Sequence, residues 1–263
     1  MIFSTIQGGL GNQMFQVACG VSHAMDISSQ YYIDYNCEFT PNQGCPASTY
    51  RHSIFKNIPV KTIPNGLTQF NENGIGFNTI PKTDNLFLNG YFQSWKYFDH
   101  NFEILIELFH LPPEYVNEAL RILEHFGVNN LNFNCIHVRC GDYTKFQNVF
   151  HLLDREYYQK GTQFLEKYNL PTIVVTDDME YARSVITTQK CIYISNQSEL
   201  VDFALLYLCK NIVIANSTFS WWASYLSREF KENVVFPNKW FRQPGMLTND
   251  LIPEAWINVE KMS

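Results

Sequence analysis

The sequence lacks any run of the roughly 18–20 apolar residues that an α-helix needs to cross a bilayer. Its first residues, MIFSTIQ, carry no positive charge and lead into no long apolar stretch, so they do not resemble a signal peptide. It also lacks a block of basic residues, and its formal net charge is -6. Proteins that bind nucleic acid usually cluster Lys and Arg. We therefore expect a soluble chain that has no transmembrane segment and does not bind nucleic acid.

The cysteines form no C-x-x-C pair, and their odd number, 7, does not make a complete disulfide framework. Several of them fall in apolar segments. We interpret them as free and mostly buried thiols of a reducing compartment, which predicts a cytoplasmic location and no zinc site. They are Cys19, Cys37, Cys45, Cys135, Cys140, Cys191 and Cys209.

Apolar residues make up 46% of the 263 residues and only 17% are charged, which supports a substantial core. In the second half, short β-rich runs alternate with helical patterns. This alternation predicts a parallel sheet that helices cover on both faces. We expect strands at residues 135–139, 172–176, 191–194, 212–215 and 234–236, and helices at residues 156–168, 179–186, 199–209 and 219–227.

The first half opens in the same way, with a strand at residues 2–6, a glycine-rich turn and a helix. A second strand is expected at residues 31–35. Residues 36–80 are rich in Pro, Gly, Asn and Thr and predict no clear element. The buried stripe expected on the first helix consists of Met14, Val17, Ala18, Val21 and Met25.

A helical pattern returns at residues 102–126, where Pro112 and Pro113 break it. We place a domain boundary after this pattern, near residues 127–132. The sequence thus predicts two α/β domains of similar size, residues 1–127 and residues 128–263.

Three of the strands expected in the second half end in polar residues. The first runs into CGDY at residues 140–143, the second into Asp177 and Asp178, and the third into NSTFS at residues 216–220. Ligands of open parallel sheets bind beyond the carboxyl ends of the strands. We therefore expect a ligand site where these three clusters meet.

In the first cluster, His137 and Arg139 point to the same face of the strand. The planar and permanently charged guanidinium of Arg139 suits the paired oxygens of a phosphate. Alternatively, Arg139 pairs with Asp142 and only closes the loop.

In the third cluster, a turn of small hydroxyl residues leads into a helix. The N–H groups at a helix start bind phosphate readily, which favours a phosphate site at residues 217–220. The alternative is ordinary capping of the helix by Ser217 or Thr218, and both roles can coexist. Trp221 and Trp222 are expected in the core.

The remaining carboxylates leave two roles open. Asp177 and Asp178 lack the spacing of a metal-binding D-x-D, so a loop or helix-capping role competes with a ligand role. Asp202 lies in an otherwise apolar helix and needs a partner. That partner is either an amino group of a ligand or a neighbouring N–H.

The glycine-rich turn supplies an alternative function. Gly9 and Gly11 between a strand and a helix resemble a dinucleotide-binding loop, and Asp34 lies about where such folds place the ribose-binding acid. Met14 in place of the third glycine weakens this match. The alternative is an NAD-dependent oxidoreductase.

Six segments, in order along the whole chain, resemble the α-1,2-fucosyltransferases of glycosyltransferase family eleven. They are GGLGNQMFQ (residues 8–16), GYFQSWKYF (90–98), HVRCGDY (137–143), TDD (176–178), NSTFSWWA (216–223) and FPNKW (236–240). Because the chain begins directly at its first strand, it is similar to the soluble bacterial or viral members of the family.

The resemblance implies an inverting enzyme of the GT-B architecture, in which two Rossmann-like domains with parallel sheets face each other across a cleft. It implies transfer of L-fucose from GDP-β-L-fucose to the 2-hydroxyl of a galactoside-type acceptor glycan, with no metal or other cofactor. The residues implied in donor binding are His137, Arg139, Asp178, Asp202, Asn216, Ser217, Thr218, Phe219 and Ser220. Those implied on the acceptor side of the cleft are Gly9, Gly11, Asn12 and Gln13.

The resemblance also implies that Arg139 is catalytic, because it would stabilise the departing diphosphate. Asp142 shares its loop and is a candidate general base, with Asp34 as a weaker choice. Cys140 departs from the family pattern His-x-Arg-Arg-x-Asp, in which a second Arg is usual. Transfer of another deoxyhexose and a non-catalytic sugar-binding role therefore stay open as alternatives.

Overall fold

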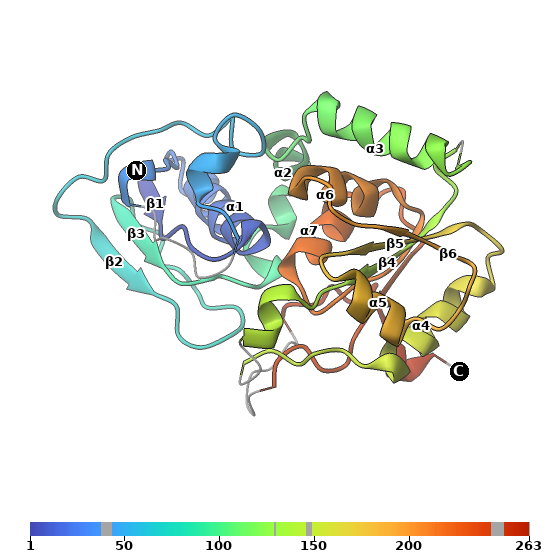
Figure 1. Cartoon of the computed structure of the whole chain (residues 1–263). Helices are drawn as coiled ribbons and strands as arrows, with labels where there is room; N and C mark the ends of the chain where they lie inside the picture. The colour runs from blue at the N-terminus through green and yellow to red at the C-terminus, as the bar shows by residue number, and fades with distance from the viewer. Residues whose placement is uncertain (38–43, 129, 146–148, 243–249, 263) are drawn as a thin grey trace. The chain divides into compact units, whose positions relative to one another are not determined.

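The computed structural model describes residues 1–37, 44–128, 130–145, 149–242 and 250–262, with only the backbone of Cys37 and Asp142 (Figure 1). The chain divides into two compact units. Unit 1 comprises Met1–His110 and Met246–Pro253, and unit 2 comprises Leu111–Gly245 and Glu254–Ser263. No helix in the described ranges combines the length and the apolar character needed to cross a membrane.

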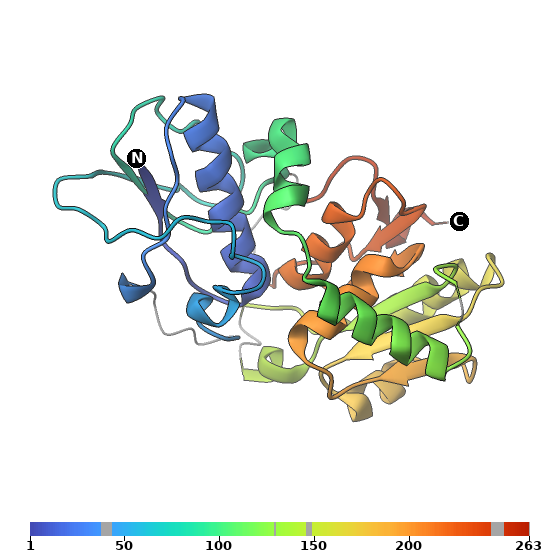
Figure 2. The same cartoon turned by 90° about the horizontal axis from the view of Figure 1, so that it is seen from above.

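Unit 1 contains a parallel three-stranded sheet in the order β1-β3-β2. Helix α1 packs against β1, and Figure 2 shows it as one long, continuous helix. The regular elements of this unit are β1 (Ile2–Ser4), α1 (Leu10–Asp26), β2 (Thr68–Asn71), β3 (Leu86–Asn89) and α2 (Phe102–Leu108), with short 3-10 turns at Tyr35–Cys37, Ala47–Tyr50, Trp95–Tyr97 and Asp99–Asn101.

The strand expected at residues 31–35 does not form as such. Tyr31 and Ile33 each make an isolated parallel bridge, and a 3-10 turn begins at Tyr35. The carboxylate of Asp34 accepts the N–H groups of Asn36 and Ile63, at 3.0 and 2.8 Å, which draws the chain into a turn.

The prediction of a buried stripe on α1 is confirmed for the first half of the helix. Met14, Val17 and Ala18 are fully buried, whereas Val21 is half-buried and Met25 is 37% exposed. The helix is buried most heavily next to the glycine-rich turn, so that turn is held by the core.

Unit 2 contains a six-stranded parallel sheet in the order β6-β5-β4-β7-β8-β9. Helices cover both faces, with α4 and α5 on one and α3, α6 and α7 on the other (Figure 1). The elements are α3 (Pro113–His125), β4 (Asn134–Val138), α4 (Arg155–Glu166), β5 (Thr172–Thr176), α5 (Met179–Val185), β6 (Cys191–Ile194), α6 (Glu199–Leu208), β7 (Asn211–Val213), α7 (Thr218–Leu226), β8 (Asn233–Phe236) and β9 (Ile257–Asn258), with 3-10 turns at Gly141–Lys145 and Val259–Lys261.

Alternation along β4 decides which side chains reach the site. Ile136 and Val138 pack with α4 and α5 in one core cluster. Cys135 and His137 point the other way: the Cys135 thiol donates to the Leu205 carbonyl of α6 at 3.6 Å, and the His137 ring lies 5.9 Å from the Phe219 ring of α7. Strand periodicity thus brings His137 to the α7 side.

The division between the units falls earlier than the boundary expected near residues 127–132. Helix α3 packs against α6 and so belongs to unit 2. The break lies between His110 and Leu111, just before Pro112 and Pro113. Pro113 is the first residue of α3, a position where its missing N–H is harmless.

All six cysteines whose side chains the structure describes are free. Four of them are buried, one is half-buried and Cys45 is exposed. The expectation of free and mostly buried thiols is confirmed for these residues.

The end of α6 depends on one lysine. The Lys231 ammonium donates to the carbonyls of Leu206, Tyr207 and Cys209, at 2.9, 3.0 and 2.7 Å. The last carbonyls of a helix have no hydrogen-bond donor within the helix. A cation beside them also interacts favourably with the negative end of the helix dipole.

We expect Lys231→Met to lower the free energy of unfolding by about 1–3 kcal/mol, because three partly buried carbonyls lose their donor. Lys210→Met is the matched control, since Lys210 makes a surface ion pair with Glu232 at 2.9 Å and such pairs contribute ~0–1 kcal/mol. Urea midpoints measure both. Equal losses in the two variants would contradict this account.

Candidate functional site

The first two polar clusters meet at Asp177, directly beyond β5. One carboxylate oxygen lies 3.0 Å from Nη1 of Arg139, and the other accepts the backbone N–H of Cys140 at 2.9 Å. A Cβ at position 141 would lie 2.5 Å from the same carboxylate, so Gly141 is needed for this approach. The ion partner of Arg139 described here is Asp177. The alternative pairing of Arg139 with Asp142 lies outside the described side chains.

The third cluster joins them through Tyr143. The Arg139 guanidinium lies over the Tyr143 ring, 5.7 Å from its centroid, and the Tyr143 hydroxyl donates to the Asn216 carbonyl at 2.8 Å. The His137 and Phe219 rings make a second link between the clusters. The three clusters expected at one sheet edge therefore come together.

The start of α7 combines the two expected roles. Ser217 caps the helix, with its Oγ accepting the Phe219 N–H at 3.3 Å, and the Ser220 hydroxyl donates to the Ser217 carbonyl. Thr218 is the first helical residue and is half-buried. Capping takes one of the four N–H groups at a helix start, so it leaves the anion-binding character of this end in place. Trp221 and Trp222 are fully buried in the core, as expected.

Three buried polar atoms at this edge have no hydrogen-bond partner among the described residues. They are Nδ1 of His137, Oδ1 of Asp202 and Oδ1 of Asn216. The Asn216 amide nitrogen, in contrast, donates to the carbonyls of His151 and Trp240, both at 2.8 Å. Buried polar groups in native proteins are nearly always paired. Three such atoms at one edge are therefore available to pair with a ligand.

Burial also changes the charge of two of these groups. Burial, with a smaller effect from Arg139, lowers the pKa of His137 to about 3. Burial raises the pKa of Asp202 to about 7, and Glu199 and Asp177 add to the rise. At neutral pH, His137 is thus neutral and Asp202 is close to half-protonated, so each can donate or accept a hydrogen bond.

Asp178 lies one residue further and has a structural role. Its carboxylate caps α5 by accepting the Tyr181 N–H at 2.9 Å. Of the two roles left open by the sequence, the helix cap is the one with observed contacts. Within the described residues, no group of three or more His, Cys, Asp or Glu side chains is placed to hold a metal ion.

The residues expected on the acceptor side hold the glycine-rich turn of unit 1 together. The Gln13 amide donates to the carbonyls of Gly8 and Cys45, both at 2.8 Å, and Asn12 accepts from the Gln93 amide at 2.8 Å. Gly9 is the N-cap of α1, and Gly11 is buried inside the helix. The contact between Asn12 and Gln93 ties the first two family-like motifs to each other.

Asp34 is bound by the backbone of its own unit. Both of its carboxylate oxygens accept backbone N–H groups of unit 1, from Asn36 and Ile63. These contacts give Asp34 a structural role in unit 1.

With this geometry in place, comparison with known proteins decides the family. Residues 54–260 match the family model described as Glycosyl transferase family 11. The chain belongs to glycosyl transferase family 11. The resemblance carried by the six motifs is therefore confirmed.

Two full-length relatives of this family 11 chain come from Escherichia coli. The O-antigen biosynthesis glycosyltransferase WbnK is 28% identical, covering 98% of this chain and all of the relative. An alpha-1,2-colitosyltransferase is 26% identical, covering 99% of each chain. The galactoside alpha-(1,2)-fucosyltransferase 2 of Gorilla gorilla gorilla is 31% identical over 52% of this chain and 44% of its own length.

Solved structures show the same fold. NodZ alpha-1,6-fucosyltransferase soaked with GDP-fucose matches with a TM-score of 0.59, covering 90% of this chain and 94% of NodZ, at 13% identity. POFUT1 in complex with GDP-fucose matches with a TM-score of 0.55, covering 89% of this chain and 97% of POFUT1, also at 13% identity. The expected GT-B-like α/β class with parallel sheets is confirmed.

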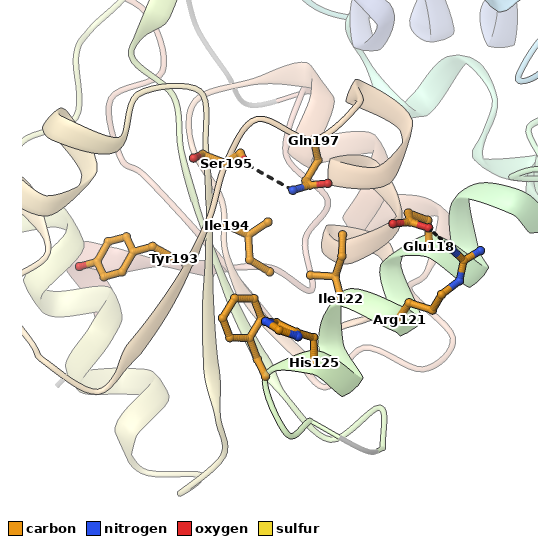
Figure 3. Close-up of a pocket in the computed structure, with 9 residues that line it drawn as sticks. Glu118, Arg121, Ile122, His125, Tyr193, Ile194, Ser195 and Gln197 are labelled. Carbon is orange, nitrogen blue, oxygen red and sulfur yellow. Dashed lines mark hydrogen bonds and ion pairs between the residues drawn. The ribbon is translucent and has the colours of Figure 1, made fainter.

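Unit 2 of this family 11 chain also has a hollow of about 460 Å³ between α3 and the end of β6 (Figure 3). Figure 3 shows Ile122 and Ile194 pointing toward each other across it, with the ion pair of Glu118 and Arg121 on the outer side of α3. None of the site residues expected from the sequence lines it. Its lining consists of Glu118, Arg121, Ile122, His125, Phe126, Tyr193, Ile194, Ser195 and Gln197.

Two residues of the predicted polar clusters make contacts that the sequence does not predict. Tyr143 connects the first and third clusters, but a tyrosine in a loop carries no signal for such a link. The sequence leaves Asp177 a loop, cap or ligand role, whereas its place beyond the strand next to β4 puts it opposite Arg139.

His137 and Asp202 have opposite effects on how the free energy of unfolding changes with pH. The pKa of His137 falls from 6.5 to about 3, so its contribution is complete above pH 6.5 and is lost as the pH falls toward 3. The pKa of Asp202 rises from 3.8 to about 7, so its contribution is complete below pH 3.8 and is lost as the pH rises toward 7.

We expect His137→Asn to make stability fall with rising pH, relative to the unaltered protein, between about pH 4 and pH 6.5. Asp202→Asn should have the opposite effect in the same window. Within the window, each substitution changes the number of protons bound on unfolding by nearly one. The slope of the free energy of unfolding against pH therefore changes by up to ~1.4 kcal/mol per pH unit. Urea midpoints across the window measure the slopes, and identical slopes in both variants would rule out the opposition.

Proposed function

We propose that this family 11 enzyme transfers L-fucose from GDP-β-L-fucose to the 2-hydroxyl of a galactoside-type acceptor glycan. The proposed reaction inverts the anomeric centre and requires no metal. Colitose is the second candidate sugar, because a relative that aligns over 99% of this chain is named an alpha-1,2-colitosyltransferase. The relatives named fucosyltransferases align over about half to two thirds of it.

The observation that carries this proposal is the carboxyl edge of the unit 2 sheet. Tyr143 links Arg139 to Asn216, which directly precedes the cap of α7, and three buried polar atoms at this edge have no hydrogen-bond partner among the described residues. A cation and a helix start suit a diphosphate. The unpaired atoms suit a group that both donates and accepts hydrogen bonds, and guanine and ribose both do so.

Asp202 supports a guanine over the other bases. Guanine presents an N–H and an adjacent amino group on one edge, and a carboxyl oxygen can accept from them. Oδ1 of Asp202, which has no hydrogen-bond partner in the part of the chain that the structure describes, would gain that contact, and the pKa of about 7 would fall as the ionised form is stabilised.

In the proposed reaction, the acceptor oxygen bonds to the anomeric carbon as the bond to the β-phosphate oxygen breaks. The electron pair of that bond leaves with the diphosphate, where negative charge grows. Arg139 and the N–H groups of the α7 start would stabilise this charge in a fixed geometry. Asp177 supports this role because it holds the guanidinium in one orientation. Asp142 stays a candidate base from its place in the same loop.

A GDP-release assay tests the function directly. Purified enzyme is incubated with GDP-fucose or GDP-colitose and a panel of β-galactosides, with and without EDTA, and the glycosidic linkage of the product is determined. We expect GDP release in the presence of EDTA and an α-1,2 product. A sugar-binding protein without activity would bind a glycan and release no GDP. An oxidoreductase would be stabilised against heat by NAD or NADP and not by GDP.

We expect Arg139→Ala to reduce kcat by about 10²–10³-fold, since removal of one fixed donor to a developing oxyanion costs ~2.7–4 kcal/mol. Arg121→Ala is the matched control, because Arg121 is 69% exposed on α3. Circular dichroism and the thermal midpoint confirm that both variants are folded. A kcat near that of the unaltered enzyme in a folded Arg139→Ala protein would refute the assignment.

A further inference from the structure

The guanidinium of Arg139 is restrained by two groups of different chemistry. A carboxylate oxygen of Asp177 lies 3.0 Å from Nη1, and the central carbon Cζ lies over the Tyr143 ring, 5.7 Å from its centroid. A long side chain has many rotamers, and each contact removes some of them. The Arg139 side chain is still 30% exposed, so a ligand can reach the charge that these two groups hold.

Tyr143 is itself fixed at two points. Its hydroxyl donates to the Asn216 carbonyl at 2.8 Å. Its ring stacks on the Phe150 ring, with the centroids 4.3 Å apart and the ring planes 10° from parallel. The side chain is 7% exposed and cannot turn without losing both contacts. Tyr143 is therefore a rigid support under the Arg139 charge.

The stack on Phe150 continues into a second loop of unit 2. Phe150 and Phe241 form an antiparallel bridge, and their rings lie 6.3 Å apart. The Arg242 N–H donates to the Val149 carbonyl at 2.8 Å. The Asn216 amide donates to one carbonyl of each loop, both at 2.8 Å. The loop after β4 and the loop after β8 are thus tied to each other and to the segment that precedes α7.

Tyr143 connects the two groups that suit a diphosphate. Its ring contacts the Arg139 guanidinium, and its hydroxyl binds the residue directly before Ser217, the N-cap of α7. Stabilisation of developing charge requires donors that are in place before the reaction. A misplacement of about 1 Å can reduce a rate by ~100-fold. The position of Tyr143 therefore bears directly on how well Arg139 and the α7 start act together.

We propose that Tyr143 is a positioning residue for the transfer reaction, which holds the Arg139 guanidinium at the start of α7. This inference rests on the proposed function. Tyr143 neither takes a proton nor forms a bond in the step. It acts through Arg139 on the diphosphate as negative charge grows there, so its removal lowers kcat and leaves the KM for the acceptor unchanged.

The test begins with Tyr143→Leu in the full-length enzyme, which removes both the ring and the hydroxyl. We expect kcat to fall ~10–100-fold, with the acceptor KM unchanged. The same substitution is then made in Arg139→Ala. There we expect a further loss of less than ~2-fold, because the group that Tyr143 positions is gone. A residue that only supports the fold would lower kcat by the same factor in both backgrounds.

Two phenylalanine variants supply a matched comparison. The Tyr157 hydroxyl donates to the Ile214 carbonyl at 2.5 Å, two residues before Asn216, and its ring packs in the core cluster of α4. Tyr143→Phe and Tyr157→Phe thus each remove one hydrogen bond to the same backbone segment. We expect kcat to fall ~3–10-fold in Tyr143→Phe and less than ~2-fold in Tyr157→Phe.

Circular dichroism and the thermal midpoint establish which variants fold. A normal kcat in folded Tyr143→Leu, or an equal loss in both backgrounds, would overturn the inference while the proposed function stands. If Tyr143→Leu does not fold, the two phenylalanine variants decide, and equal kcat values in them overturn it. An unaltered enzyme that neither binds GDP nor releases it from either donor would overturn the proposed function itself.

Discussion

The contact between Asp177 and Arg139 is the interaction on which the unit 2 site depends. A lone arginine at a strand end has many rotamers, and ordering it costs conformational entropy. Here the carboxylate that follows β5 holds the guanidinium that follows β4, and it binds the next backbone N–H as well. Parallel pairing of β4 with β5 brings the two residues to the same level. The sheet register therefore fixes the position of the charge.

This site carries a stability cost that a ligand would offset. Leaving a buried polar atom unpaired costs about 1–3 kcal/mol, and His137, Asp202 and Asn216 each have one such atom without a partner among the described residues. A ligand that pairs with them binds only the folded chain, so it raises stability in proportion to the logarithm of its concentration over Kd. The polar atoms that lower stability at this edge are thus the ones that would give a ligand its specificity.

The sequence predicts unit 2 well because its strands are apolar and its helices are capped. Residues 172–176 and 191–194 are predicted with the bounds that β5 and β6 have, and the three polar clusters are predicted at one edge. Unit 1 is predicted poorly, since β2 has the polar sequence TQFN and is mostly exposed. The sequence therefore gives no signal for Glu72, whose carboxylate accepts the N–H groups of Tyr91 and Phe92. Glu72 follows a strand that no pattern indicates. Tyr31 to Asp34 alternate like a strand, but hydrogen bonds to Asp34 turn the chain.

The two units share one arrangement of a carboxylate and a loop, with different chemical surroundings. In each, a carboxylate beyond one strand accepts backbone N–H groups from the loop after the neighbouring parallel strand, and a glycine there allows the approach: Asp177 with Gly141, and Glu72 with Gly90. Asp177 has Arg139 beside it and orients this cation. Glu72 has no cation among the described groups that act on it, and burial raises its pKa. The same geometry thus holds a guanidinium in place in unit 2 and a carboxylate of raised pKa in unit 1.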